Sequence, residues 1–191
     1  MSTDLGRPRD PRIDGAVLRT TVELLGEAGY ADLTVDAIAR RARTSKPAIY
    51  RRWPSKAHVV HEAVFPIGEG TALPDTGSLA GDVREMVRRT TAVLTTPAAR
   101  AALPGLVGEM AADPALHAAL LERFSDVLSR GLTDRLDDAV TRGEARPDVT
   151  AAELVEAIAG ITLMALITRR DALDDAWTER TAALITRGIS T

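Results

Sequence analysis

The sequence contains no cysteine and very few aromatic residues. The absence of cysteine from all 191 residues excludes disulfides, cysteine-ligated zinc, iron–sulfur clusters and thiol catalysis, and it fits a reducing compartment. Aromatic residues make up 3% of the chain, which argues against a ligand site built on ring stacking. The hydrophobic content of 45% is ordinary for a globular protein of one or two domains.

Signals for membrane insertion and export are also lacking. We expect no apolar run that approaches the roughly 18 residues of a membrane-spanning helix. Segment 1–12 is polar and has no apolar stretch of the kind that a secretory signal requires. The sequence therefore predicts a cytoplasmic protein with no membrane partner.

Patterns for catalysis or metal binding are equally scarce. The sequence has no glycine-rich phosphate loop and no serine nucleophile elbow, and its adjacent carboxylates fall on exposed helix faces. His58 and His61 are three residues apart and could share a metal, but no third ligand is evident and His117 stands alone. We favour a surface or DNA-side histidine pair and expect no enzyme activity, no metal site and no cofactor.

What the chain does have is an uneven distribution of charge. Residues 1–60 carry 11 Lys and Arg against 7 Asp and Glu, whereas residues 61–191 carry 13 against 20. Seven basic side chains lie between Arg40 and Lys56, and no acidic residue occurs from 37 to 56. Phosphate binding needs a local basic patch rather than a basic protein. The alternative, that these charges cover solvated helix faces, suits the acidic part better than segment 40–56.

The periodicity of apolar residues is helical almost throughout, so we predict an all-α fold. Gly29 is suited to end the first helix, Thr34, Ser45 and Ser55 are good N-caps, and Thr150 with Glu153 has capping-box spacing. Segment 66–77 has the composition of a loop. The predicted helices cover 12–28, the region after Thr34, 45–52, 55–65, 78–95, 98–112, 114–142, 151–169 and 175–188.

Segment 34–56 combines two short helices with the basic cluster. Apolar residues of both helices can pack against the first helix, and the small Ala39 and Ala42 allow a close crossing. The second short helix, 45–52, is then free to enter a DNA major groove, with its N-terminal residues at the base edges. The side chains that would flank the groove, where phosphates lie, are Thr34, Tyr50, Arg52 and Lys56.

In an ordered set of motifs the sequence resembles the TetR family of bacterial transcriptional regulators. The resemblance covers about residues 12–65 and is carried by Gly29-Tyr30, Leu33-Thr34-Val35, Ile38-Ala39, Ser45-Lys46-Pro47-Ala48-Ile49-Tyr50 and Trp53-Pro54-Ser55-Lys56. It implies a dimeric repressor of a DNA operator, with a ligand pocket in the C-terminal helices. By position it also implies that Lys46, Pro47 and Tyr50 enter the groove while Thr34, Arg52 and Lys56 contact phosphates.

Two positions depart from the family pattern. The turn usually holds a glycine where this chain has Arg43, so this residue either adopts a left-handed backbone, at a cost of about 1 kcal/mol, or the turn differs. Arg43 could also add a phosphate contact. Trp53 replaces a residue that is more often Phe or Val, and we interpret it as core packing that orients Tyr50. The predicted DNA-binding set is Thr34, Arg43, Ser45, Lys46, Pro47, Ala48, Tyr50, Arg51, Arg52 and Lys56.

We divide the chain into a flexible basic arm (1–11), a helix-turn-helix DNA-binding domain (12–54), a connecting helix (55–65) and a helical domain for ligand binding and dimerisation (66–191). Arg7, Arg9 and Arg12 could follow DNA into the minor groove, or the arm could be a solubilising tail. Neither alternative is favoured by the sequence.

The C-terminal part offers candidates for a ligand pocket and for a dimer face. Inward stripes and adaptable methionines suggest a pocket for an unknown small, hydrophobic and aliphatic effector, although plain core is the alternative. The candidates are Met86, Leu106, Met110, Phe124, Leu128 and Met164. Segment 154–167 is apolar on more than one face and could form a four-helix dimer interface with 175–188, or the core of a monomer. A helical ligand-binding or interaction protein with another partner for its basic head is the competing function.

Overall fold

A computed structural model describes residues 11–66, 75–169 and 171–191, with side chains except at 11 and 123–130. All regular structure in these ranges is helical, which confirms the all-α prediction, and the one isolated bridge joins Ala145 and Ser190. The helices are α1 (Pro11–Asp32), α2 (Val35–Arg41), α3 (Lys46–Tyr50), α4 (Lys56–Val64), α5 (Leu79–Leu94), α6 (Pro97–Ala112), α7 (Pro114–Thr141), α8 (Ala151–Thr168) and α9 (Asp175–Ile189).

Local capping sets most helix starts where the sequence predicts them. The Thr34 and Ser45 hydroxyls each accept a hydrogen bond from a backbone N–H three residues later, at 3.2 Å. Thr150 and Glu153 form the predicted capping box. Ser55 precedes α4, but its hydroxyl pairs with Nδ1 of His58 at 2.9 Å and caps no backbone group.

The first helix is interrupted where the sequence predicts its end. Gly29 has a φ of 73°, a conformation that glycine adopts without steric cost, and one further helical turn continues to Asp32. This break directs the chain towards α2. Residues 1–10 of the predicted arm, which include Arg7 and Arg9, lie outside the described residues.

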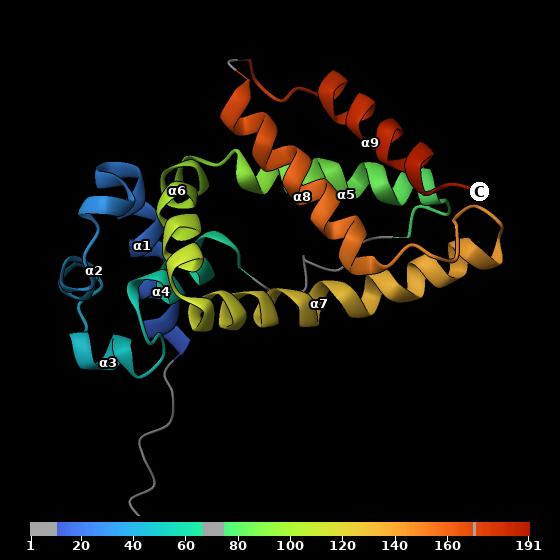
Figure 1. The fold of residues 1–191 in the computed structure, drawn as a ribbon. Coiled ribbons are helices and arrows are strands. Elements are labelled where there is room, and N and C mark those ends of the chain that lie inside the picture. Colours follow the sequence, from blue (N-terminus) through green and yellow to red (C-terminus); the bar gives the residue numbers. More distant parts are fainter. Residues whose placement is uncertain (1–10, 67–74, 170) are drawn as a thin grey trace, which may run out of the picture.

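Buried apolar side chains form two clusters. The head cluster draws on α1 to α4 and also on α6 and the start of α7, and it includes Ile38, Ile49 and Leu106. The body cluster draws on α5 and α7 to α9 and includes Val83, Ile158 and Trp177. In Figure 1, α6 stands beside α1 and α4, between the helix-turn-helix and the rest of the molecule. The body therefore contacts the head chiefly through α6.

Helix α5 is the centre of the body. Both α8 and α9, the two helices predicted to pair in a dimer interface, pack against α5 within the single chain. Helices α2 and α3 lie at one end of the molecule and α9 at the other (Figure 1). The predicted DNA-binding helices, α2 and α3, are thus well separated from α9, which the sequence predicts in the dimer interface.

The expectation that no apolar run approaches the length of a membrane-spanning helix is wrong. Helix α8, over its full 18 residues, has a mean hydropathy of 1.7 and is long and apolar enough by composition to cross a membrane. A single helix of this kind is weak evidence for a membrane span, and only 28% of it is buried in the single chain. Helix α8 is not a membrane span, and its apolar surface needs another explanation.

Candidate nucleic-acid interface

The turn between α2 and α3 resolves the alternatives for Arg43. Its φ of 54° is left-handed, so Arg43 accepts the conformation that a glycine would adopt more easily. The following N–H, of Thr44, donates to the carbonyl of Ala39 at 3.0 Å and closes the end of α2. The Arg43 side chain is exposed beside α3.

Helix α3 is anchored on one side and open on the other. Ile49 is buried in the head cluster, and α3 packs against α2. Tyr50 is 43% exposed, an unusual environment for a large ring in a chain with so few. Ala48 is half-buried, and the exposed residues of the predicted set on or near α3 are Thr34, Arg43, Ser45, Lys46, Pro47, Tyr50 and Arg51.

Lys46, the first residue of α3, is paired with an acid of α2. Its Nζ lies 2.7 Å from Oδ2 of Asp36, and the hydrogen bond and charge of that carboxylate raise the pKa of Lys46. Both side chains are exposed, so the pair is accessible to DNA. Lys46 is therefore a fully protonated cation whose orientation is set by Asp36.

Arg52 is placed differently from the other basic residues. It forms an ion pair with Asp14 of α1, and its side chain is only 16% exposed. This contact holds the segment after α3 against α1. The phosphate contact assigned to Arg52 stays a prediction, and the structure adds a structural role.

Lys56, at the start of α4, is also held in place. Its Nζ donates to the backbone carbonyl of Tyr30 at 3.1 Å and lies 4.1 Å from the centre of the Tyr30 ring. The end of α1 thereby fixes a cation that the sequence assigns to a phosphate.

The histidine pair is not a surface pair. His61 is buried, with its ring 5.3 Å from that of Phe65, while His58 is half-buried and bonded to Ser55. Within the described ranges, no group of three His, Cys, Asp or Glu side chains could hold a metal ion. His61 is better described as a member of the head interior.

The pocket candidates fall in several places. Met86 belongs to the body cluster, Leu106 and Met110 to the head cluster, and Met164 is 58% exposed and so does not point inward. The Phe124 and Leu128 side chains lie outside the described part. That these residues line one pocket stays a prediction.

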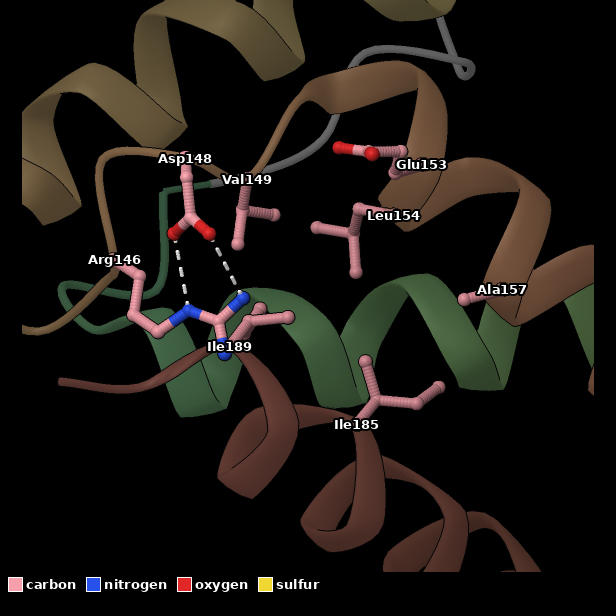
Figure 2. Close-up of a pocket in the computed structure, with 8 residues that line it drawn as sticks. All are labelled: Arg146, Asp148, Val149, Glu153, Leu154, Ala157, Ile185 and Ile189. Carbon is pink, nitrogen blue, oxygen red and sulfur yellow. Dashed lines mark hydrogen bonds and ion pairs between the residues drawn. The ribbon is translucent and has the colours of Figure 1, made fainter.

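A separate groove of about 270 Å³ lies near the C-terminus. Figure 2 shows it between the segment before α8, the first half of α8 and the end of α9. Arg146 at its rim is paired with Asp148, at 3.1 Å between Nε and Oδ1, and also donates to the carbonyl of Gly188 at 3.2 Å. None of the six candidates lines this groove, whose apolar floor includes Leu154, Ile185 and Ile189.

Sequence reasoning missed the partners of the basic residues. Asp14, Asp36 and Tyr30 orient Arg52, Lys46 and Lys56, respectively. For Asp36 a signal was available, because it is the only acidic residue between positions 33 and 61. The other two partners lie on α1, and only the three-dimensional packing brings them near.

The exposed helix α3 is bordered by basic side chains and belongs to a head that joins a larger helical body. This is the arrangement of a helix-turn-helix DNA-binding regulator. Residues 17–63 match the family model for bacterial regulatory proteins of the tetR family, and residues 73–185 match the tetracyclin repressor-like C-terminal domain. The chain belongs to the TetR family of transcriptional regulators. This confirms the resemblance of the sequence and the DNA-binding regulatory function that it implies.

Relatives and solved structures agree with this assignment. The chain is 34% identical over 159 residues to the HTH-type transcriptional regulator Rv1556 of Mycobacterium tuberculosis, covering 81% of this chain and 78% of that protein. It is 31% identical over 174 residues to the DNA-binding transcriptional repressor TetR of Mycobacteroides abscessus, covering 86% and 87%. The crystal structure of the TetR-family regulator SCO0332 superposes with a TM-score of 0.72 at 31% identity, covering 94% of this chain and all of that one.

Membership in the family carries general properties. TetR-family regulators bind DNA operators, act as dimers and typically respond to a ligand. They are normally not enzymes.

Proposed function

We propose that this protein is a cytoplasmic, homodimeric repressor that binds a pseudo-palindromic operator through α3 and is released by a small hydrophobic effector. In this proposal residues 12–54 form the DNA-binding domain, 55–65 connect it to the body, and 66–191 bind effector and partner. The protein acts by binding alone, without catalysis, metal or cofactor. The observation that carries the proposal is the open face of α3, bordered by basic side chains, on an otherwise acidic protein.

The contacts of α3 with DNA follow from its exposed side chains. Lys46, Pro47 and Tyr50 face the groove, where an ammonium reaches acceptors on guanine and apolar surfaces meet thymine methyl groups. Thr34 and Arg43 border the groove on the α2 side and supply donors to phosphate. Arg51 is the exposed guanidinium of this helix end, suited to a base edge.

The dimer face is proposed on α8 and α9. A stripe of exposed small and apolar residues runs along α8, through Ala157, Gly160, Met164 and Ile167, and Leu184 is exposed on α9. Ile167 is 70% exposed in the single chain, an unfavourable position for a large aliphatic side chain in water. A second copy of α8 and α9 would bury this stripe and explain the apolar composition of α8.

Operator selection tests the proposal. Wild-type protein is used to enrich DNA from a random library, and the enriched sequences are read. We expect two inverted half-sites whose centres are one helical turn of DNA, about 10 base pairs, or a multiple of it apart. Enrichment of a single unpaired site, or of no site, would overturn the homodimeric part or the whole of the proposal, respectively.

A further inference from the structure

Tyr30 holds Lys56 by two different groups. The Tyr30 carbonyl accepts a hydrogen bond from the ammonium at 3.1 Å, and the ring face lies 4.1 Å from the same nitrogen. An ammonium has three N–H donors; one goes to the carbonyl and one faces the ring, so Lys56 keeps one for a phosphate. These two contacts hold the otherwise flexible side chain of Lys56, so that its ammonium has a fixed position at the start of α4.

The ring of Tyr30 is itself fixed by a glycine of the body helix α6. A Cβ atom at position 105 would lie 2.0 Å from Cδ1, 2.5 Å from Cγ and 2.6 Å from Cε1 of Tyr30. Only glycine permits this approach, so any side chain at 105 must displace the ring. Tyr30 is buried, and this burial, with the Glu109 carboxylate of α6 beside it, raises the pKa of its hydroxyl.

We propose that Gly105 and Tyr30 are positioning residues for the DNA-binding cation Lys56. The proposal rests on the proposed function, in which Lys56 contacts an operator phosphate. Displacement of the ring by a side chain at 105 removes the π face and shifts the carbonyl that directs the ammonium. A single position in α6 therefore sets the strength of a phosphate contact made by α4, although Gly105 itself lies away from DNA.

Two glycines of α6 provide a matched pair of variants. A Cβ at Gly105 collides with Tyr30, whereas a Cβ at Gly108 has no atom within 4 Å. Gly105→Ala and Gly108→Ala are compared as full-length chains on DNA selected by the wild type, over a range of salt concentrations. We expect Gly105→Ala to weaken binding and to reduce the slope of log affinity against log salt by about 0.9 per head, and Gly108→Ala to change neither.

Combination with Lys56→Ala separates positioning from a general effect on folding. If Gly105 acts through Lys56, Gly105→Ala causes no further loss of affinity in the Lys56→Ala background. An equal loss in both backgrounds, or an unchanged Gly105→Ala, overturns the inference. A wild type that selects no DNA contradicts the proposed function instead.

Variants of Tyr30 keep the test informative if Gly105→Ala does not fold. Tyr30→Phe retains the ring and the carbonyl, so we expect wild-type affinity and slope. Tyr30→Leu removes the ring but keeps an apolar side chain, and we expect a loss of affinity that disappears in the Lys56→Ala background. A loss that persists there contradicts the proposal, and thermal unfolding of each variant shows that it is folded.

Discussion

Arg43 has a strained backbone in the place where the chain turns towards α3. A left-handed residue other than glycine costs about 1 kcal/mol, and a glycine loses about as much through the flexibility of the unfolded chain. We therefore expect Arg43→Gly to leave the free energy of unfolding unchanged within about 0.5 kcal/mol. The same variant should reduce the salt dependence of operator binding by about 0.9 per head, because a phosphate contact is lost.

Arg43→Ala is the control for this prediction. It removes the guanidinium but keeps the strain, so the slope should fall as in Arg43→Gly without relief of the backbone. Chemical denaturation and fluorescence titration at several salt concentrations measure the two quantities. A wild-type slope in both variants would mean that Arg43 makes no phosphate contact.

Asp36 places a negative charge beside α3, the helix that we propose enters the DNA groove. It orients Lys46 but also repels phosphates, and Asp36→Asn keeps its shape while removing its charge. We expect this variant to bind random-sequence DNA about three- to tenfold more tightly, with a salt slope steeper by up to about 0.9 per head. The preference for the operator over random DNA should fall, because a freed lysine contacts any phosphate.

Asp32→Asn makes the same change of charge at the exposed end of α1. It should have a smaller effect, since Asp32 does not pair with Lys46. Competition between labelled operator and unlabelled random DNA measures the preference. Equal effects of the two variants would show that only net charge matters.

At the scale of the element, α5 carries a coupled group of charges. Arg88 and Arg89 both contact Oε1 of Glu85, at 2.7 Å and 2.6 Å, and hydrogen bonding from Arg88 first and then from Arg89 lowers the pKa of Glu85 to about 2. A lowered pKa stabilises the folded state fully above the ordinary value of 4.5 and loses that stabilisation as the pH falls towards 2.

Glu85→Gln should therefore reduce the loss of stability between pH 4.5 and pH 2 by about 1 kcal/mol, the upper end for exposed ion pairs. Urea denaturation at a series of pH values measures this. Glu179→Gln, which removes a more exposed ion pair with Arg84, serves as control and should change the profile less. An unchanged profile in Glu85→Gln would mean that the two arginines do not stabilise the carboxylate.

The sequence predicts the elements of this fold well, because helix starts depend on neighbouring residues. Thr34, Ser45 and the Thr150–Glu153 box act within one helical turn, so their effect is legible without a structure. Contacts between distant segments cannot be predicted from neighbouring residues in this way. The pairing of Asp14 with Arg52 and the fit of Tyr30 onto Gly105 depend on the crossing of helices, which no local pattern specifies.

The same distinction between local patterns and long-range contacts holds for the candidate DNA site. The exposed set around α3 follows from the motif, whereas the restraint on Lys46, Arg52 and Lys56 comes from packing. Periodicity alone does not identify the inward face of α8, because this helix is apolar on several faces; Met164, which the sequence places inward, is exposed. The acidic residues in the first turns of α8 interrupt its apolar run, but its mean hydropathy over 18 residues still reaches that of a membrane-spanning helix.

At the scale of the whole molecule, the exposed apolar stripe predicts self-association. We expect Ile167→Glu combined with Leu184→Glu to convert a dimer into a monomer, because charges would be buried without partners. Val22→Glu, at an exposed aliphatic residue of α1 that lies away from α8 and α9, should remain dimeric. Sedimentation analysis distinguishes the two, and a monomeric wild type or a dimeric double variant would contradict the assignment of the interface.

The central claim is that the open face of α3 reads a specific DNA sequence. The most direct measurement is binding of the wild type and of a Lys46→Ala/Tyr50→Ala variant to the DNA that flanks the protein's own coding region, titrated against salt. We predict tight, sequence-selective and strongly salt-dependent binding by the wild type, and loss of selectivity in the variant. The claim would be contradicted if the wild type, like the variant, bound flanking and random DNA equally well.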